Sequence, residues 1–235
     1  MGSPQQLCSL AQAVHQNGYS AATLLLPGHG GSARDFTSST FEGWQRHVDS
    51  KIERFSADFE NIWLVGHSMG GLLAINSAVS FSRSVRGIFT IACPFRMSMF
   101  SPYAIRIRFK QVISKKSDPM RIAYLTGSSV TPSLSLIWYG HRPTSELKKL
   151  MSAARSNLSQ VHIPVTAVYS TSDELTSILS LDILKAELTA APLVTIMLTD
   201  SLHAYYPEKE QSVIKESLLR FLWGISPEKG IPCLV

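Results

Sequence analysis

The sequence has few cysteines, and their placement excludes two common kinds of site. Only Cys8, Cys93 and Cys233 occur in 235 residues. An odd number of widely separated cysteines fits neither a disulfide framework nor a zinc site with paired ligand spacing. We therefore expect reduced thiols, and the residues imply neither a metal nor another cofactor.

Long apolar runs are absent as well. The longest, "AATLLLP" and "LSLIWY", fall well short of the roughly 18 residues that a membrane-spanning helix requires. The first residues show no positive charge followed by an apolar stretch, so no secretory signal peptide is predicted. We expect a domain without a transmembrane segment and with a cytoplasmic location.

Charge of one sign is not concentrated enough to indicate nucleic-acid binding. The chain has 22 Lys and Arg against 17 Asp and Glu, but the basic residues are scattered and no nucleic-acid motif accompanies them. What the chain does have is 45% hydrophobic residues and no biased tract. That balance is typical of one globular domain with a sizeable core.

Short apolar runs alternate with amphipathic segments along most of the chain. Strands are expected at 19–27, 61–66, 85–95, 164–170 and 193–199, and helices at 5–17, 41–56, 70–81, 180–188 and 208–223. In the helix at 41–56, Trp44, Val48, Ile52 and Phe55 recur with the period of one helix face. The alternation predicts an α/β fold, a mainly parallel sheet with helices on both faces.

Residues 95–160 interrupt this alternation, and we expect them to form a small cap inserted before the last two strands. Within them, "IRIRFK" alternates like a strand, while Ile105, Phe109, Val112 and Ile113 also fit one helix face, so both readings stay open. An insertion at the carboxyl edge of a parallel sheet lies over any site there. The predicted organisation is a core (1–94 and 161–225), a cap (95–160) and a C-terminal tail (226–235).

A serine stands on a tight corner in "WLVGHSMGG". Ser68 lies between Gly66 and Gly70, after a predicted strand and before a predicted helix. G-x-S-x-G in that context is typical of a nucleophile elbow, a sharp turn that lifts the serine hydroxyl above the sheet; an ordinary tight turn is the alternative. The N–H of Met69, at the helix N-terminus, is predicted to stabilise an oxyanion.

A serine hydroxyl needs a base to take its proton and an acid to orient that base. An elbow of this kind predicts the chain order Ser, acid, His. His203 follows the predicted strand at 193–199 and is the predicted base. Asp173, just after the strand at 164–170, is the predicted acid, with the adjacent Glu174 as its first rival. Asp200 is expected to belong to the turn before His203.

Together these motifs resemble the α/β-hydrolase fold and, within it, the bacterial carboxylesterase and monoacylglycerol lipase family. The resemblance runs from about Gly2 to about Trp223 and rests on "LPGHGGS", "GHSMGG", "ACPF", "STSDELTS" and "DSLHAYYPEKE", in family order. It implies hydrolysis of short or medium acyl esters or of monoacylglycerols without a metal. By the same resemblance Ser68 is the nucleophile, Asp173 the acid and His203 the base.

The front of the chain departs from that family pattern. Family members have further strands and a His-Gly-Phe-like loop before the segment that "MGSPQQL" resembles, and this loop donates the first oxyanion N–H. One of these strands lies between those that "ATLLLP" and "IWLVG" resemble. The resemblance thus implies a truncated N-terminus and an incomplete oxyanion hole, a loss of about 100- to 1,000-fold in turnover. A catalytically impaired remnant is therefore one alternative, and hydrolysis of thioester, amide or carbon–carbon bonds by the same triad is another.

Basic residues gather in the predicted cap. Seven Lys and Arg between residues 96 and 121 face one acidic residue, Asp118, with aromatic residues interleaved. A basic and apolar lid is attracted to an anionic lipid surface, although charge runs are more often simply solvated. The expected partners are a small-molecule or lipid ester and, weakly, a membrane surface through the cap.

Overall fold

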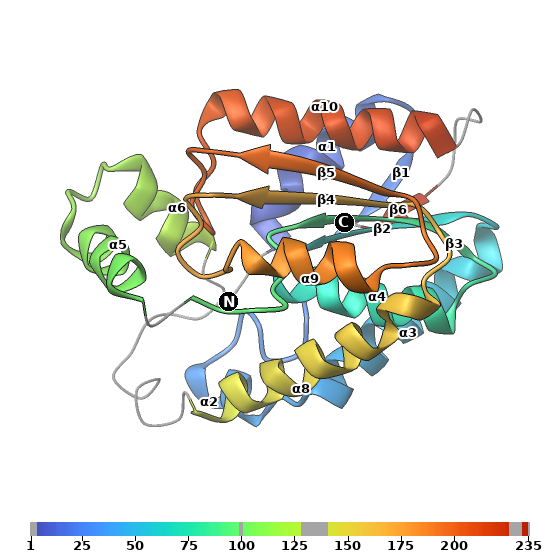
Figure 1. Ribbon diagram of the computed structural model, residues 1–235, viewed down its shortest axis with the longest axis horizontal. Coiled ribbons are helices and arrows are strands. Elements are labelled where there is room, and N and C mark those ends of the chain that lie inside the picture. Colours follow the sequence, from blue (N-terminus) through green and yellow to red (C-terminus); the bar gives the residue numbers. More distant parts are fainter. Residues whose placement is uncertain (1–3, 99–100, 128–140, 226–231, 235) are drawn as a thin grey trace.

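One parallel sheet forms the centre of the molecule. The computed structural model describes residues 4–98, 101–127, 141–225 and 232–234 (Figure 1). Its six strands follow the order β1-β6-β2-β3-β4-β5, and each neighbouring pair is parallel. The strands are β1 (Ser20–Ala22), β2 (Ile62–His67), β3 (Val85–Ile91), β4 (Val165–Ser170), β5 (Leu193–Leu198) and β6 (Pro232–Leu234). The predicted parallel sheet is confirmed.

Helices cover both faces of this sheet (Figure 1). One face carries α1 (Cys8–Gln16) and α10 (Glu208–Ile225); the other carries α3 (Phe41–Asp58), α4 (Met69–Ser80), α8 (His141–Asn157) and α9 (Leu179–Glu187). Shorter elements are η1 (Pro4–Leu7), α2 (Ala33–Ser38) and η2 (Leu158–Gln160). Because helices bury both faces of the central strands β2, β3 and β4, these strands are apolar runs rather than alternating ones, whereas the edge strand β5 is partly exposed.

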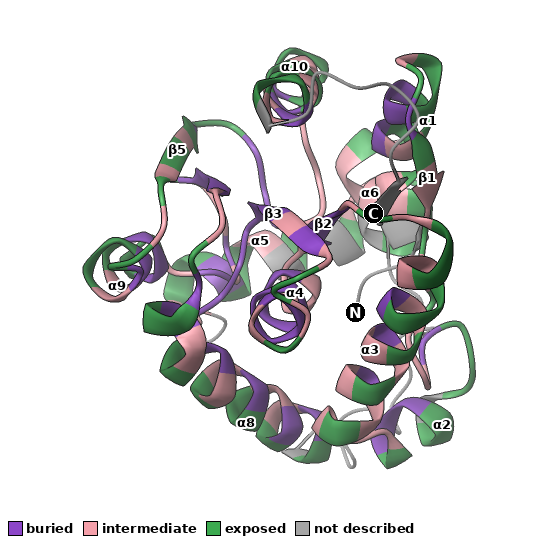
Figure 2. Cartoon of the chain, turned by 90° about the vertical axis from the view of Figure 1, so that its right-hand side faces the viewer, coloured by how far each residue is buried: buried purple, intermediate pink, exposed green. Residues whose placement is uncertain are grey.

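The helix α4 lies deepest of these. Its residues from Gly71 to Ala78 are all buried, since β2 and β3 contact one side of the helix and α8 packs on another (Figure 2). A helix that is hydrophobic all round belongs in a core. By contrast, α3 buries one face through Trp44, Val48 and Ile52. Thr40 caps its N-terminus, because its side chain accepts the Gly43 N–H at 3.1 Å.

The strand expected at 19–27 is much shorter than predicted. β1 covers only Ser20–Ala22, and its neighbour β6 pairs with it from Ser20↔Pro232 to Ala22↔Leu234. A strand persists only where a neighbour accepts and donates its backbone hydrogen bonds. The apolar run after Ala22 instead leads into the turn at Pro27–Gly30, in which Gly28 and Gly30 have positive φ angles.

The strand β6 was not predicted. It lies in the segment expected to be a C-terminal tail, and it pairs with β2 at Trp63↔Cys233 and Leu64↔Leu234. It therefore occupies the place between the neighbouring strands where the family resemblance implied a gap. Three residues are too few for a periodic signal, and their pairing partners lie far away in the sequence. The domain boundaries themselves stay predictions.

In the expected cap, the ambiguous segment "IRIRFK" is helical. It belongs to α5 (Pro102–Ile113), which starts with Ser101 accepting the Ala104 N–H at 3.1 Å and with Pro102 in the first turn. With α6 (Pro119–Gly127), it lies beyond the carboxyl ends of β4 and β5 (Figure 1). Across the ranges that the structure describes, no helix combines the length and apolar composition needed to cross a membrane.

Cys233→Pro tests whether β6 is a true member of the sheet. Proline removes a backbone N–H from a strand that lies between two neighbours, so we expect the free energy of unfolding to fall by roughly 1–3 kcal/mol. Cys233→Val keeps the N–H and favours strands, and is the matched control. Thermal melts followed by circular dichroism measure both. Equal midpoints for the two variants would contradict the position of β6.

Candidate active site

Ser68 occupies a strained turn between β2 and α4. Its backbone angles, φ 52° and ψ −120°, lie in a region that residues other than glycine rarely adopt. Its N–H donates to the carbonyl oxygen of Ile91 in β3 at 2.8 Å, which holds the turn against the neighbouring strand. The predicted elbow geometry is thus present, and the alternative of an ordinary turn is not.

A close crossing of strand and helix explains part of the glycine pattern. A Cβ atom at Gly66 would lie 2.4 Å from the backbone of Gly70 and Gly71, so no larger residue fits there without movement. At Gly70 nothing lies within 4 Å of an added Cβ, whereas at Gly71 the Cys93 sulfur would be 2.9 Å away. The turn therefore requires a glycine at position 66. The second position at which an added Cβ would be crowded is Gly71, whereas Gly70 has room for one.

The structure brings together the three side chains that the sequence singled out. His203 Nε2 lies 3.0 Å from Ser68 Oγ, and His203 Nδ1 lies 2.9 Å from Asp173 Oδ2. The other carboxylate oxygen of Asp173 accepts the N–H groups of Leu175 at 2.8 Å and Thr176 at 2.7 Å. The three come from the carboxyl ends of different strands, which meet at one edge of the sheet.

Charges and hydrogen bonds at this edge oppose the effect of burial. Burial alone would raise the pKa of Asp173, but the charge of His203 and hydrogen bonds from His203, Thr176 and Leu175 hold it below its usual range. Burial alone would lower the pKa of His203, yet the charge and hydrogen bond of Asp173 and the charge of Glu174 raise it above 6.5. An ionised Asp173 therefore faces an imidazole whose pKa is raised.

The two neighbouring carboxylates take different positions. Glu174, 2% exposed, accepts the backbone N–H of His203 at 2.9 Å, whereas Asp173 contacts the imidazole ring. Asp200 has an exposed side chain, and its N–H donates to Glu210 at 3.1 Å. The geometry therefore favours Asp173 over its rival as the partner of the ring.

Two further residues contact His203 that the sequence analysis did not select. His67 Nε2 lies 2.9 Å from the carbonyl oxygen of His203 and 3.1 Å from the hydroxyl oxygen of Tyr206. Burial, and after it the charge of His203, lowers the pKa of His67 to about 3. The only signal for His67 in the sequence was its place directly before Ser68, and for Tyr206 its place in "HAYYPEKE".

A groove of about 860 Å³ adjoins these two residues. Its wall includes His67, Tyr205 and Tyr206 together with residues of η1, α1, α6 and α10, and neither Ser68 nor His203.

Met69 is the first residue of α4, so no carbonyl group within the helix can accept a hydrogen bond from its N–H. In the part of the chain that the structure describes, no group of three or more His, Cys, Asp or Glu side chains could hold a metal ion.

A strained serine between strand and helix at the carboxyl edge of a parallel sheet defines a class of proteins, the α/β hydrolases. The comparison with protein families agrees with this class. Residues 5–196 match the model of the "Alpha/beta hydrolase family". The chain belongs to the alpha/beta hydrolase family, and the predicted fold and family are confirmed.

Relatives within this class include lipases. A thermostable monoacylglycerol lipase from Bacillus sp. (strain H-257) is 24% identical over 227 residues, 94% of this chain and 86% of that protein. The structure of Paleococcus ferrophilus monoacylglycerol lipase superposes with a TM-score of 0.68 at 17% identity, covering 94% of this chain and 90% of that one. A soluble variant of monoglyceride lipase from Saccharomyces cerevisiae gives a TM-score of 0.69 at 12% identity, covering 96% and 83%. These structural likenesses establish the shared fold.

Gly66→Ala and Gly70→Ala form a matched pair that tests the crossing of β2 and α4. The added methyl at Gly66 overlaps the backbone, so we expect a loss of roughly 1–3 kcal/mol in stability, the usual cost of overpacking. At Gly70 the methyl meets open space inside a helix, and we expect unchanged stability or a gain of up to about 1 kcal/mol. Denaturant unfolding measures both, and a tolerated Gly66→Ala would refute the crossing.

Proposed function

We propose that this chain is a serine hydrolase that cleaves carboxylic esters, either short or medium acyl esters or monoacylglycerols. One observation carries the proposal: hydrogen-bond distances link the Ser68 hydroxyl, both ring nitrogens of His203 and the Asp173 carboxylate in one continuous series. The names of the relatives, monoacylglycerol and monoglyceride lipases, support the substrate class.

In the first half of the reaction His203 acts as the base. Its Nε2 takes the proton of Ser68 as the serine oxygen attacks the ester carbonyl. Asp173 holds the Nδ1–H and stabilises the positive charge that forms on the ring. The N–H of Met69, at the N-terminus of α4, donates to the developing oxyanion.

The second half regenerates the serine. When the bond to the alcohol oxygen breaks, His203 gives its proton to the departing alcohol and an acyl ester remains on Ser68. His203 then takes a proton from a water molecule, whose oxygen attacks the acyl carbonyl. The bond between the acyl carbon and Ser68 Oγ breaks, His203 returns the proton to Ser68, and the carboxylic acid leaves. Each step needs the imidazole to keep contact with both Ser68 and Asp173.

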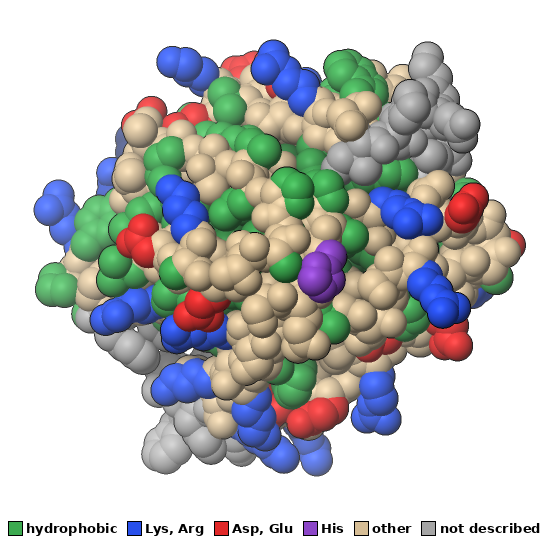
Figure 3. All heavy atoms as spheres, turned by 45° about the vertical axis from the view of Figure 1, so that its right-hand side comes forward, with side chains coloured by type: hydrophobic (Ala, Val, Ile, Leu, Met, Phe, Trp, Pro, Cys, Tyr) green, Lys and Arg blue, Asp and Glu red, His purple; other side chains and the backbone are tan. Residues whose placement is uncertain are grey.

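The same proposal includes contact of the predicted cap, through its helices α5 and α6, with an anionic lipid surface. Large apolar side chains are exposed on α5 and α6: Tyr103, Ile105, Phe109, Ile113, Ile122 and Leu125. Cationic side chains lie among them: Arg106, Lys110, Lys115, Lys116 and Arg121. On the face in Figure 3, by contrast, Lys and Arg are interspersed with Asp and Glu. Apolar anchors with basic residues favour contact of a cytoplasmic enzyme with a membrane surface.

The decisive experiment is hydrolysis of p-nitrophenyl butyrate by the purified chain and its triad variants. We expect Ser68→Ala and His203→Ala to lower kcat by about 10⁴-fold or more, and Asp173→Asn to lower it less. Full activity of folded Ser68→Ala would refute the proposal. No turnover by the folded parent chain would favour the impaired remnant, and turnover only of thioesters or amides would favour the other reaction class.

Vesicle sedimentation tests the membrane contact. We expect binding to phosphatidylcholine vesicles that contain phosphatidylglycerol to exceed binding to phosphatidylcholine alone, and to weaken at high salt. Phe109→Ser combined with Ile113→Ser should weaken binding at least about tenfold, because two exposed apolar anchors are lost. Val194→Ser with Val213→Ser, on β5 and α10, is the control. Equal binding by both double variants would exclude the cap as the contact.

A further inference from the structure

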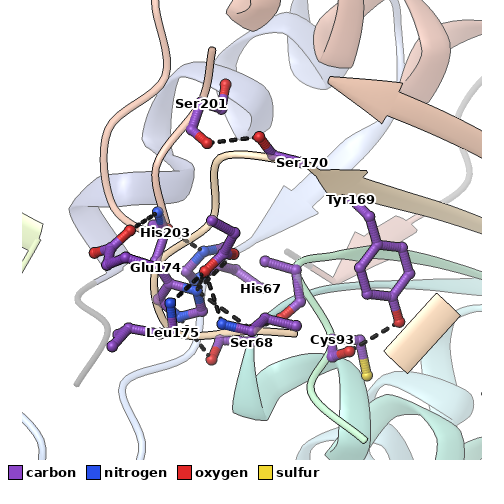
Figure 4. A network of polar contacts seen from close by, with 12 residues as sticks. His67, Ser68, Cys93, Tyr169, Ser170, Glu174, Leu175, Ser201 and His203 are labelled. Carbon is purple, nitrogen blue, oxygen red and sulfur yellow. Dashed lines mark hydrogen bonds and ion pairs between the residues drawn. The ribbon is translucent and has the colours of Figure 1, made fainter. Parts of the chain in front are cut away.

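The main chain of His203 is held as closely as its ring. Its N–H donates to Glu174 Oε2 at 2.9 Å. Its carbonyl oxygen lies 2.9 Å from His67 Nε2 and accepts the Tyr206 hydroxyl at 3.2 Å. Figure 4 shows Glu174 and His67 beside His203. Both polar backbone groups of His203 therefore bond to side chains: the N–H to one carboxylate, and the carbonyl oxygen to two donors.

These bonds matter because His203 lies in an irregular segment. Residues 199–207, between β5 and α10, form neither helix nor strand. A loop residue has no hydrogen-bonded ladder to fix its position, so side-chain contacts must do so. Other contacts hold the rest of the loop: the Leu202 N–H donates to the Tyr205 carbonyl at 2.8 Å, and Ser170 Oγ donates to the Ser201 carbonyl at 2.6 Å.

The burial of Glu174 requires an explanation of its own. Its side chain is 2% exposed, and burying a carboxylate is unfavourable unless hydrogen bonds or an opposite charge compensate. The His203 N–H and, during turnover, the positive charge on the His203 ring provide this compensation. A buried carboxylate in this position therefore stabilises both the location of His203 and its protonated form.

His67 completes the arrangement as a neutral donor. Since a carbonyl oxygen only accepts, the Nε2 atom facing His203 carries the hydrogen. Burial lowers the pKa of His67 to about 3, so it adds no positive charge beside the imidazole at neutral pH. The titratable groups that face His203 are then Asp173 and Glu174 after β4, His67 at the end of β2, and Tyr206 in its own loop.

We propose that Glu174 is a positioning residue of the reaction, which holds the main chain of His203 against His67 and Tyr206 so that the ring stays between Ser68 and Asp173. This assignment rests on the proposed function, because it concerns the same site. It differs from the role of the ring partner Asp173: Glu174 acts on the backbone and through its charge, and it touches neither the substrate nor the reacting atoms.

Two substitutions separate these contributions in the hydrolysis of p-nitrophenyl butyrate. Glu174→Ala removes the acceptor of the His203 N–H, and we expect kcat to fall about 10- to 100-fold with KM unchanged. Glu174→Gln keeps an acceptor oxygen and removes the charge, so it should restore most of kcat. Because the lost charge raised the pKa of His203, the acidic limb of kcat/KM should move to lower pH.

Asp200→Asn is the matched control, since it removes an exposed charge from the loop that carries His203. We expect its kcat and pH profile to match those of the parent chain. Wild-type kcat in a folded Glu174→Ala variant would overturn the positioning role. So would an acidic limb of kcat/KM in Glu174→Gln that matches the parent chain. If Glu174→Ala does not fold, the pH profile of Glu174→Gln alone tests the role. Turnover that survives Ser68→Ala would refute the proposed function and this role together, whereas its loss beside unaffected Glu174 variants would refute only the role.

Discussion

The close crossing of β2 and α4 is the constraint on which the rest of the site depends. A Cβ atom at Gly66 would lie 2.4 Å from the backbone of Gly70 and Gly71, so strand and helix approach as near as polypeptide backbones allow. The chain between them turns through a single residue, Ser68, at φ 52°. The surrounding core compensates for that strain, since α4 is buried between the sheet and α8. A hydroxyl so placed stands above the helix N-terminus.

Parallel pairing then determines what can reach this hydroxyl. Because β2, β4 and β5 all end at one edge, the loops after β4 and β5 bring Asp173 and His203 to a serine more than 100 positions earlier in the chain. Direct contacts join these loops. Ser170 Oγ donates to the Ser201 carbonyl at 2.6 Å (Figure 4), and Thr176 Oγ1 donates to that of Ala92 at 3.1 Å. The edge therefore behaves as one hydrogen-bonded unit rather than as separate loops.

Within this unit two adjacent carboxylates have different environments. Asp173 receives two backbone N–H groups and the imidazole, so its charged form is well stabilised despite burial. Glu174 contacts the His203 main chain instead. Both charges act in the same direction on the ring, raising the pKa of His203 against the effect of burial. An imidazole in this environment holds a proton more readily than burial alone would allow.

The sequence by itself determined the elements with local signals: the apolar strands β2 to β5, the amphipathic helix α3 and the tight turn around Ser68. Only the tertiary structure decided the matters that depend on contacts between distant residues. These were the insertion of β6 between β1 and β2, the helical state of α5, and the contact of Glu174 with the main chain of His203. Strand pairing, burial and side-chain direction are set by neighbours in space, and a periodic pattern along one chain does not identify those neighbours.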